Sequence, residues 1–236
     1  MIDVANHVIR TSWPKFMLDG FTNNPYWRAL FEAYPKFQFL LVEDTTHEVM
    51  GVGNSIPLAW ADNLSKLPEE GWDWALKQGM EDYAADRRVR TLSALAISVV
   101  PKYRGMGIST YLIKAMKAIS KRHELETLIV PARPMLKSLY PLTPMKQYIN
   151  WLNDQSLPFD PWVRAHTKLG GEIIKVCSES MLITGTISDW EQRTRIRFPE
   201  SGPYIIPDAL VPIEINYDKD QGVYLEPNVW LHHRVG

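Results

Sequence analysis

Cysteine is almost absent from this sequence, which has Cys177 alone in 236 residues. A single cysteine cannot form an internal disulfide, and it provides no cysteine cluster for a metal site. A reducing compartment fits such a chain best. We therefore expect a cytoplasmic protein.

Long apolar runs are missing as well. No stretch approaches the ~20 apolar residues that a membrane-spanning helix needs, and the opening residues MIDVANHVIR lack the basic and apolar segments of a secretory signal. We expect neither a membrane partner nor a cleaved leader.

Charge of one sign is not concentrated anywhere. The formal net charge is −1, and no stretch gathers a run of like charges. Nucleic-acid binding normally needs a strongly basic face, so we do not expect a nucleic-acid partner. An apolar fraction of 45% with 22% charged residues is typical of a soluble globular protein. Without an internal repeat or an evident linker, residues 1–236 are expected to form a single domain.

The first third of the chain predicts two short helices followed by a strand, a polar turn and a strand. The helices are expected at 12–21, capped by Ser12, and at 24–34, capped by Asn24. Two apolar, β-rich runs separated by EDTTHE predict an antiparallel hairpin or a short meander within 37–60.

The middle of the chain predicts a helix and then a strand, helix and strand. A polar helix is expected at 71–90, and the uncharged run TLSALAISVV at 91–100 is typical of a central strand. Apolar residues from Ile108 to Ile119 recur at helical spacing. With the next strand at 126–132, these segments predict a parallel, right-handed βαβ unit.

The last hundred residues have a less regular pattern of apolar residues. Prolines in 133–160 indicate loops around one short helix, and Asp160 would cap a helix that ends at the glycine pair before Glu172. Residues 172–186 are expected to form a hairpin of two strands. The tail would add a small helix within SDWEQRT and a late hairpin of ALVPIEINY and GVYLEPNVWLHH across DKDQ.

The turn PKYRGMGIST carries the clearest chemical signal. Gly105 and Gly107 lie where the central strand passes into its helix. Unpaired N–H groups at a helix start, together with the helix dipole, suit an anion such as a phosphate. The turn lacks the Lys-Ser/Thr of a P-loop and the third glycine of a dinucleotide fingerprint. By itself it fits a plain strand-to-helix connection equally well.

The residues around this turn resemble a known signature. VVPKYRGMGIS is similar to the acyl-CoA-binding segment of the GNAT superfamily of N-acetyltransferases, V-x-P-x-x followed by Q/R-x-x-G-x-G/A. Val99, Pro101, Arg104 and Gly107 match this pattern. Ser109 stands where the family usually has Gly or Ala.

A second segment supports the resemblance. RAHTKLGG is similar to the family's Y-x-K-L-G-F segment, and the order of expected elements from about residue 10 to 186 matches the GNAT arrangement. The resemblance implies an α/β fold of the GNAT type, with a central mixed β-sheet flanked by helices. Residues 133–160 would be an insertion, and 187–236 a C-terminal extension.

The resemblance also implies a site for acetyl-CoA or another acyl-CoA as co-substrate. The pyrophosphate would lie on the backbone N–H groups of the glycine turn, and the pantetheine arm along the end of the central strand. The residues so implied are Ile97, Val99, Arg104, Gly105, Met106, Gly107, Ile108, Ser109 and Thr110.

His166 is the expected catalytic residue. In many relatives a tyrosine at this position, four residues before the glycine, protonates the departing thiolate. An imidazole could act there as acid or base, although a hydrogen-bonded structural histidine fits equally well. The central strand has no glutamate to serve as an alternative base. His232 and His233 remain weak candidates, and no spacing of histidines and carboxylates predicts a metal site.

The resemblance implies an acyl-CoA-dependent acyltransferase, an N-acetyltransferase in which a small-molecule amine attacks the thioester directly. A non-catalytic acyl-CoA-binding protein, and other thioester chemistry such as decarboxylation or transfer to a carrier protein, remain open. Aromatic residues in the regions that wall the acceptor end predict a bulky or aromatic acceptor, or else pack the insertion onto the core. They are Trp13, Tyr26, Trp27, Tyr140, Tyr148, Trp151 and Trp162. The oligomeric state is left open.

Overall fold

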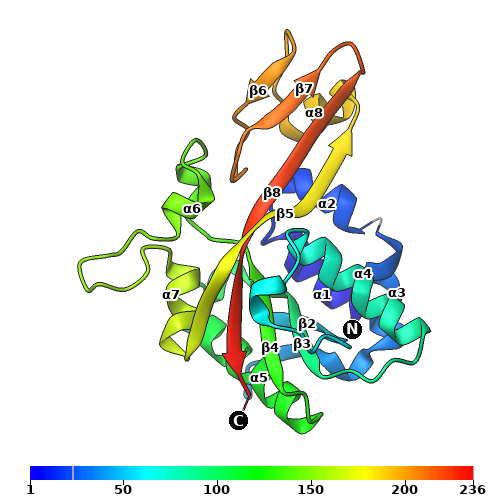
Figure 1. Ribbon diagram of the computed structural model, residues 1–236, viewed down its shortest axis with the longest axis vertical. Coiled ribbons are helices and arrows are strands. Elements are labelled where there is room, and N and C mark those ends of the chain that lie inside the picture. Colours follow the sequence, from blue (N-terminus) through cyan, green and yellow to red (C-terminus); the bar gives the residue numbers. More distant parts are fainter. Residues whose placement is uncertain (23, 236) are drawn as a thin grey trace.

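The computed structural model describes residues 1–22 and 24–235 and is built around one mixed sheet (Figure 1). The eight strands follow the order β1-β2-β3-β4-β8-β7-β6, with β5 paired to β8. The strands are β1 (Gln38–Val42), β2 (Val49–Leu58), β3 (Thr91–Val99), β4 (Thr127–Ala132), β5 (Gly171–Gly185), β6 (Gly202–Tyr204), β7 (Ile213–Asn216) and β8 (Gln221–Arg234). The prediction of an α/β fold with a central mixed sheet is confirmed.

Helices cover both faces of this sheet. They are α1 (Ile2–Arg10), α2 (Lys15–Thr22), α3 (Pro25–Ala33), α4 (Gly71–Ala84), α5 (Ile108–Arg122), α6 (Met145–Tyr148), α7 (Pro161–Lys168) and α8 (Ile187–Thr194). Side chains of α1, α3 and α4 share one apolar core with Ile129 of β4, whereas α5 and α7 share another with its neighbours Leu128 and Val130. This alternation follows from the two-residue period of a strand. In the described part of the chain, no helix is both long enough and apolar enough to cross a bilayer.

Local capping explains where several helices begin. The Asn24 side chain accepts a hydrogen bond from Tyr26 N (2.9 Å), and Pro25 occupies the first turn of α3. Asp160 caps α7 in the same way by accepting from Trp162 N and Val163 N. These predicted caps are confirmed. Helix α1 was not anticipated from the sequence.

The central βαβ unit is confirmed, with β3 and β4 parallel. The two strands pair only where Thr91–Ser93 of β3 face Thr127–Ile129 of β4, and beyond these residues they separate. Just beyond this point β3 bulges, because Asn54 and Ser55 of β2 face Ala96 and Ala94 and leave Leu95 without a partner. A bulge of this kind redirects the backbone. Here it opens a gap between β3 and β4.

The predicted hairpin at 172–186 is wrong. These residues form one continuous strand, β5, which pairs with β8 over its whole length. Residues 178–180 form a bulge, and the Glu69 carboxylate binds both the N–H and the hydroxyl of Ser178 (3.0 and 2.9 Å). The polar residues 178–180 (SES) therefore form a bulge within one strand, although in the sequence they resemble a turn between two strands.

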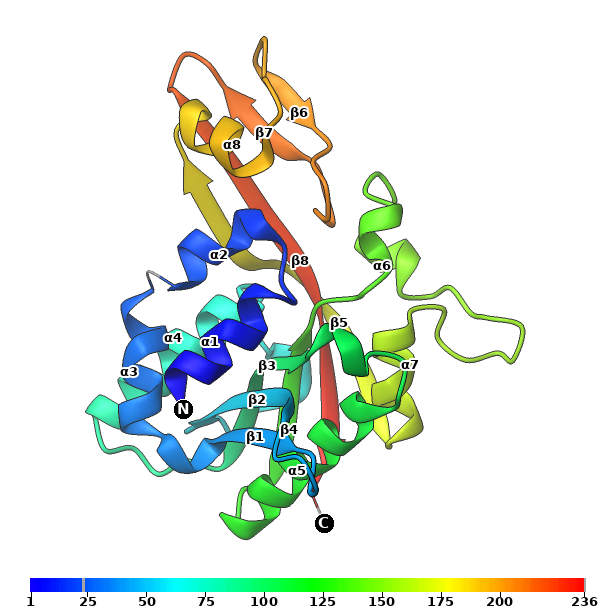
Figure 2. The ribbon, with the colours of Figure 1, turned by 180° about the vertical axis from the view of Figure 1, so that it is seen from behind.

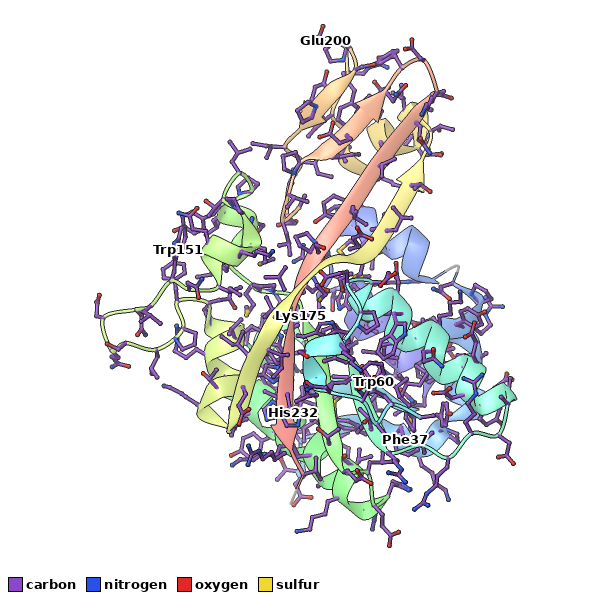
Figure 3. All side chains as sticks on the ribbon, in the orientation of Figure 1. Phe37, Trp60, Trp151, Lys175, Glu200 and His232 are labelled. Atoms are coloured by element: carbon purple, nitrogen blue, oxygen red, sulfur yellow. The ribbon has the colours of Figure 1, made fainter. Side chains whose placement is uncertain are left out.

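The late hairpin exists, but its second strand is also part of the central sheet. Strand β8 pairs with β7 over Gln221–Val223 and with β4 over Val229–Arg234. Strand β8, which belongs to the segment 187–236 that was expected to be a C-terminal extension, therefore lies between β4 and β7 in the central sheet. Figure 2 shows the result, an upper lobe of β6, β7 and α8 joined to the lower lobe by the long strands β5 and β8. In Figure 3, Glu200 marks the tip of the upper lobe and His232 the lower half of β8.

Candidate active site

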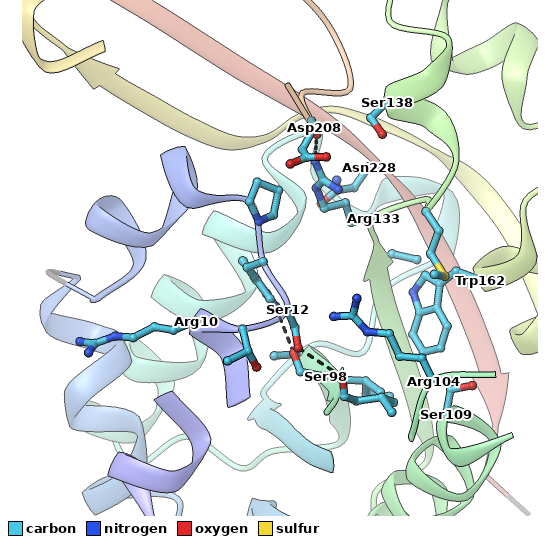
Figure 4. A pocket seen from close by; sticks show the side chains of 18 of the residues that line it. Arg10, Ser12, Ser98, Arg104, Ser109, Arg133, Ser138, Trp162, Asp208 and Asn228 are labelled. Carbon is cyan, nitrogen blue, oxygen red and sulfur yellow. Dashed lines mark hydrogen bonds between the residues drawn. The ribbon is translucent and has the colours of Figure 1, made fainter. Parts of the chain in front are cut away.

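A cleft of about 1040 Å³ opens where β3 and β4 separate (Figure 4). Its walls are residues 94–99 of β3, 130–132 of β4, the glycine turn, the segment 10–16 between α1 and α2, and the start of α7. The upper lobe closes the far end with residues 193–195 and 207–208. The cleft therefore joins the predicted cofactor turn to the C-terminal part of the chain.

The glycine turn has the backbone that an anion site needs. Gly105 and Gly107 have φ values of +78° and +75°, which are left-handed conformations that favour glycine. An added Cβ at either position would meet nothing within 4 Å, so space is open beside the backbone. Gly107 is the N-cap of α5, and no side chain caps that helix. Its first N–H groups are therefore left for a ligand.

Most of the predicted cofactor residues lie together in the cleft. Those in its lining are Ile97, Val99, Arg104, Gly105, Gly107, Ile108 and Ser109. Met106 and Thr110 are not in the lining, and Met106 is 64% exposed. Their role in cofactor binding stays a prediction. Lys102 forms an ion pair with Glu48, which balances its charge.

The gap at the β3 bulge is held open by hydrogen bonds from tryptophans. Trp72 Nε1 donates to the Leu95 carbonyl (2.7 Å), and Trp13 Nε1 donates to Ser98 Oγ (3.1 Å). Trp72 and Trp13 also pack edge to face, with ring centroids 6.5 Å apart. Trp72 was missed by the sequence analysis, because its position in α4 reads as an ordinary core residue.

His166 lies behind the cleft rather than in its lining. Its side chain is buried, and its Nδ1 lies 2.8 Å from Nε2 of His233. Burial, and then the neighbouring His233, lower the pKa of His166 to about 3, so the imidazole is neutral near pH 7. Trp162 lines the cleft and packs against His166 with ring centroids 4.4 Å apart. The catalytic role of His166 stays a prediction, and Trp162 is a contact that links this position to the cleft.

Most of the aromatic residues that were expected to wall the acceptor end lie elsewhere in the structure. Trp13 and Trp162 line the cleft, whereas Trp27 is buried in the core beneath α3. Tyr148 packs with the other aromatic residues of the insertion, Tyr140, Trp151 and Phe159. Packing of the insertion onto itself and the core therefore accounts for most of this set.

A polar network lies where β8 passes from β7 to β4. Arg133 Nε donates to both carboxylate oxygens of Glu226 (3.0 Å each), and its Nη2 donates to the Asp208 carbonyl (2.6 Å). The Tyr224 hydroxyl and Asn228 Nδ2 also donate to the Glu226 carboxylate, at 2.7 and 3.2 Å. This network was not predictable from the sequence, because its members are brought together by the long-range pairing of β8.

Basic side chains dominate the charge of the cleft. The cations in the lining are Arg10, Lys15, Arg104, Arg133, Arg193 and Arg195. Such a lining favours anionic groups such as the phosphates of a nucleotide. Asp208 is the one acidic side chain among the described lining residues. Within residues 1–22 and 24–235, no group of three or more His, Cys, Asp or Glu side chains is arranged to hold a metal ion.

The separated parallel strands, the bulge and the glycine turn together define the GNAT fold, and comparison with solved structures confirms it. The loading GNAT-like domain of CurA from Lyngbya majuscula superposes with a TM-score of 0.63 at 17% identity, over 99% of this chain and 94% of that chain. The GphF GNAT-like decarboxylase, solved in complex with isobutyryl-CoA, superposes with a TM-score of 0.58 at 12% identity, over 100% of this chain and 95% of that chain. The chain therefore has a GNAT-like fold.

A curated relative is more similar in sequence. The arginine N-acetyltransferase avaD of Aspergillus versicolor is 29% identical over 255 residues, a match that covers 97% of this chain and 87% of the relative. No protein-family model matches the sequence.

Proposed function

We propose that this protein is an acyl-CoA-dependent N-acetyltransferase that transfers an acetyl group from acetyl-CoA to the amine of a small molecule. The observation that carries the proposal is the cleft, which runs from an uncapped, glycine-rich helix start to the gap between β3 and β4. The similarity to an arginine N-acetyltransferase over nearly the whole chain supports the same activity. Arginine is accordingly the first acceptor to test.

The cofactor residues fit an acyl-CoA. The backbone of Gly105 and Gly107 lets phosphate oxygens approach the start of α5, where no Cβ is in the way, and Arg104 adds a positive charge. The edge of β3 after Ser93 has no strand partner on the β4 side. It offers backbone groups to the amides of a pantetheine arm.

Positioning supplies most of the proposed catalysis. The acceptor nitrogen attacks the thioester carbonyl, the new C–N bond replaces the C–S bond, and the proton of the amine passes to the thiolate of coenzyme A. A backbone N–H at the Leu95 bulge is suited to stabilise the carbonyl oxygen, as oxyanion-hole donors do. Holding both reactants in one cleft lowers the barrier by up to about 7–11 kcal/mol in favourable cases.

The activity is tested by incubating the purified chain with acetyl-CoA and a panel of amines that includes arginine. We expect free thiol and the acetylated amine to form in equal amounts, measured by a thiol reagent and by mass spectrometry. Carbon dioxide release from malonyl-CoA in the absence of an amine would identify decarboxylation instead. Binding of acyl-CoA with no turnover of any substrate would leave a non-catalytic binding protein and contradict the proposal.

A further inference from the structure

Asp208 carries a negative charge in a cleft whose other charged lining residues are basic. It is the one carboxylate among the described lining residues. Its backbone carbonyl accepts a hydrogen bond from Arg133, yet in the described part of the chain its carboxylate oxygens have neither a hydrogen-bond donor nor an ion-pair partner. Asp208 is exposed, so its carboxylate is accessible to a ligand.

The backbone around this carboxylate is held firmly. Leu210 N donates to the Tyr224 hydroxyl (2.9 Å), and Lys137 Nζ donates to the Leu210 carbonyl (2.6 Å). Asp208 itself has φ +64°, a left-handed conformation that Asp and Asn tolerate better than most residues. A side chain that is unpaired but mounted on an anchored segment is preorganised for binding.

Arg133 does not neutralise Asp208. Its guanidinium faces both oxygens of Glu226, which is completely buried. The Arg133 charge is thus balanced by a different carboxylate. Arg133 instead fixes the Asp208 segment through the carbonyl.

The position of Asp208 identifies its ligand. Figure 4 shows Arg104 and Ser109 at one end of the cleft and Asp208 with Arg133 at the other. The first end suits the diphosphate of coenzyme A, so the second end faces the acceptor. We propose that Asp208 binds the cationic side chain of the acceptor, a guanidinium group as in arginine. This inference rests on the proposed function.

Arginine and citrulline test the inference, since citrulline replaces the guanidinium by a neutral ureido group of nearly the same shape. With acetyl-CoA, we expect kcat/KM for arginine to exceed that for citrulline by about 10- to 100-fold, the worth of a charge-assisted contact. In Asp208→Asn this preference should fall to about twofold or less, chiefly through the KM of arginine. The KM of acetyl-CoA should not change.

Asn suits this test because it tolerates the same left-handed backbone, and a thermal melt verifies folding. Asp218→Asn, in the exposed turn between β7 and β8, is the matched control and should keep the wild-type preference. Equal use of arginine and citrulline by the wild type, a better rate with glutamate, or an unchanged preference in Asp208→Asn would overturn the inference and leave the N-acetyltransferase function intact. Failure to acetylate any amine would overturn both.

Discussion

Gly107 is the residue on which the proposed cofactor site depends most. Its φ of +75° and the open space beside it distinguish it from an ordinary helix N-cap. Gly170, at the end of α7, has a similar φ of +81° and similar open space, but it lies outside the cleft lining. Substituting Gly107 and Gly170 in turn therefore distinguishes the effect of backbone strain from the effect on ligand binding.

Gly107→Ala and Gly170→Ala should each lower the free energy of unfolding by about 1 kcal/mol, because a Cβ is disfavoured in the left-handed conformation. Only Gly107→Ala should also weaken coenzyme A binding, by about tenfold, since its Cβ projects beside the phosphate position. Urea unfolding and titration calorimetry measure the two effects. Equal coenzyme A affinity in both variants would contradict the assigned turn.

Among single residues, the sequence predicted those whose role depends on their neighbours in the chain. The glycines of the turn were identifiable because a left-handed helix start needs them. Asp208, Arg133 and Glu226 were not identifiable, because they meet only when β8 passes between β4 and β5. Nothing near them in the chain indicates that contact.

Strand β8 is the element on which the two lobes depend. Between its segments paired with β7 and with β4 lie Glu226 and Asn228, and the buried Glu226 carboxylate is satisfied by Arg133 and Tyr224. Burial, and the charge of Glu226, also raise the pKa of nearby Asp73 to about 6, against a hydrogen bond from Leu182 N. The junction is therefore sensitive to the loss of any one charge.

Glu226→Gln should lower the free energy of unfolding by about 3 kcal/mol, because it leaves the Arg133 guanidinium without its buried counterion. Glu172→Gln is the control, since Glu172 faces Arg234 at 3.8 Å in an exposed pair and should cost less than about 1 kcal/mol. Denaturant unfolding of the two variants measures the difference. Similar losses in both would show that the junction is not a point of special stability.

Helix α7 and strand β8 are joined by the buried His166–His233 pair. Burial is the main reason that the pKa of His166 falls to about 3 and that of His233 to about 4. In the unfolded chain both imidazoles titrate near pH 6.5. Below that pH the unfolded chain takes up protons that the native protein excludes, so protonation favours unfolding.

The free energy of unfolding should therefore decrease as the pH falls from 6.5 towards 4, by up to about 1.4 kcal/mol per pH unit for each histidine. His166→Asn should show a smaller slope than the wild type in urea unfolding at several pH values. Parallel slopes would refute the buried neutral pair. A fall in kcat of roughly 100-fold in the same variant, with the KM of acetyl-CoA and the thermal melt unchanged, would support the catalytic role that the sequence predicts for His166.

The elements themselves were predictable where one segment carries its own signal. Asn24 and Asp160 mark helix starts, and the spacing from Ile108 to Ile119 marks α5. The strand β5 was predicted wrongly as a hairpin, because polar residues that fill a bulge resemble those that form a turn. Only the partner strand distinguishes the two.

For the whole molecule, the GNAT fold brings a lower lobe with the cofactor turn against an upper lobe that completes the cleft. The GNAT-like fold was predictable from two short motifs in the right order. The contribution of the upper lobe was not, because it depends on the course of β8 through the centre of the sheet. Local signals therefore indicated the type of fold, whereas the proposed acceptor end depends on the long-range pairing of β8.

The central claim is that the helix start at Gly107 binds the diphosphate of coenzyme A in this cleft. Titration calorimetry of the wild-type chain with coenzyme A and with acetyl-CoA tests it most directly. We predict saturable binding of both ligands with one site per chain, weakened by adding salt because the contact is ionic. A folded wild-type protein that gives no binding heat and no thermal shift with either ligand at millimolar concentration would contradict the account.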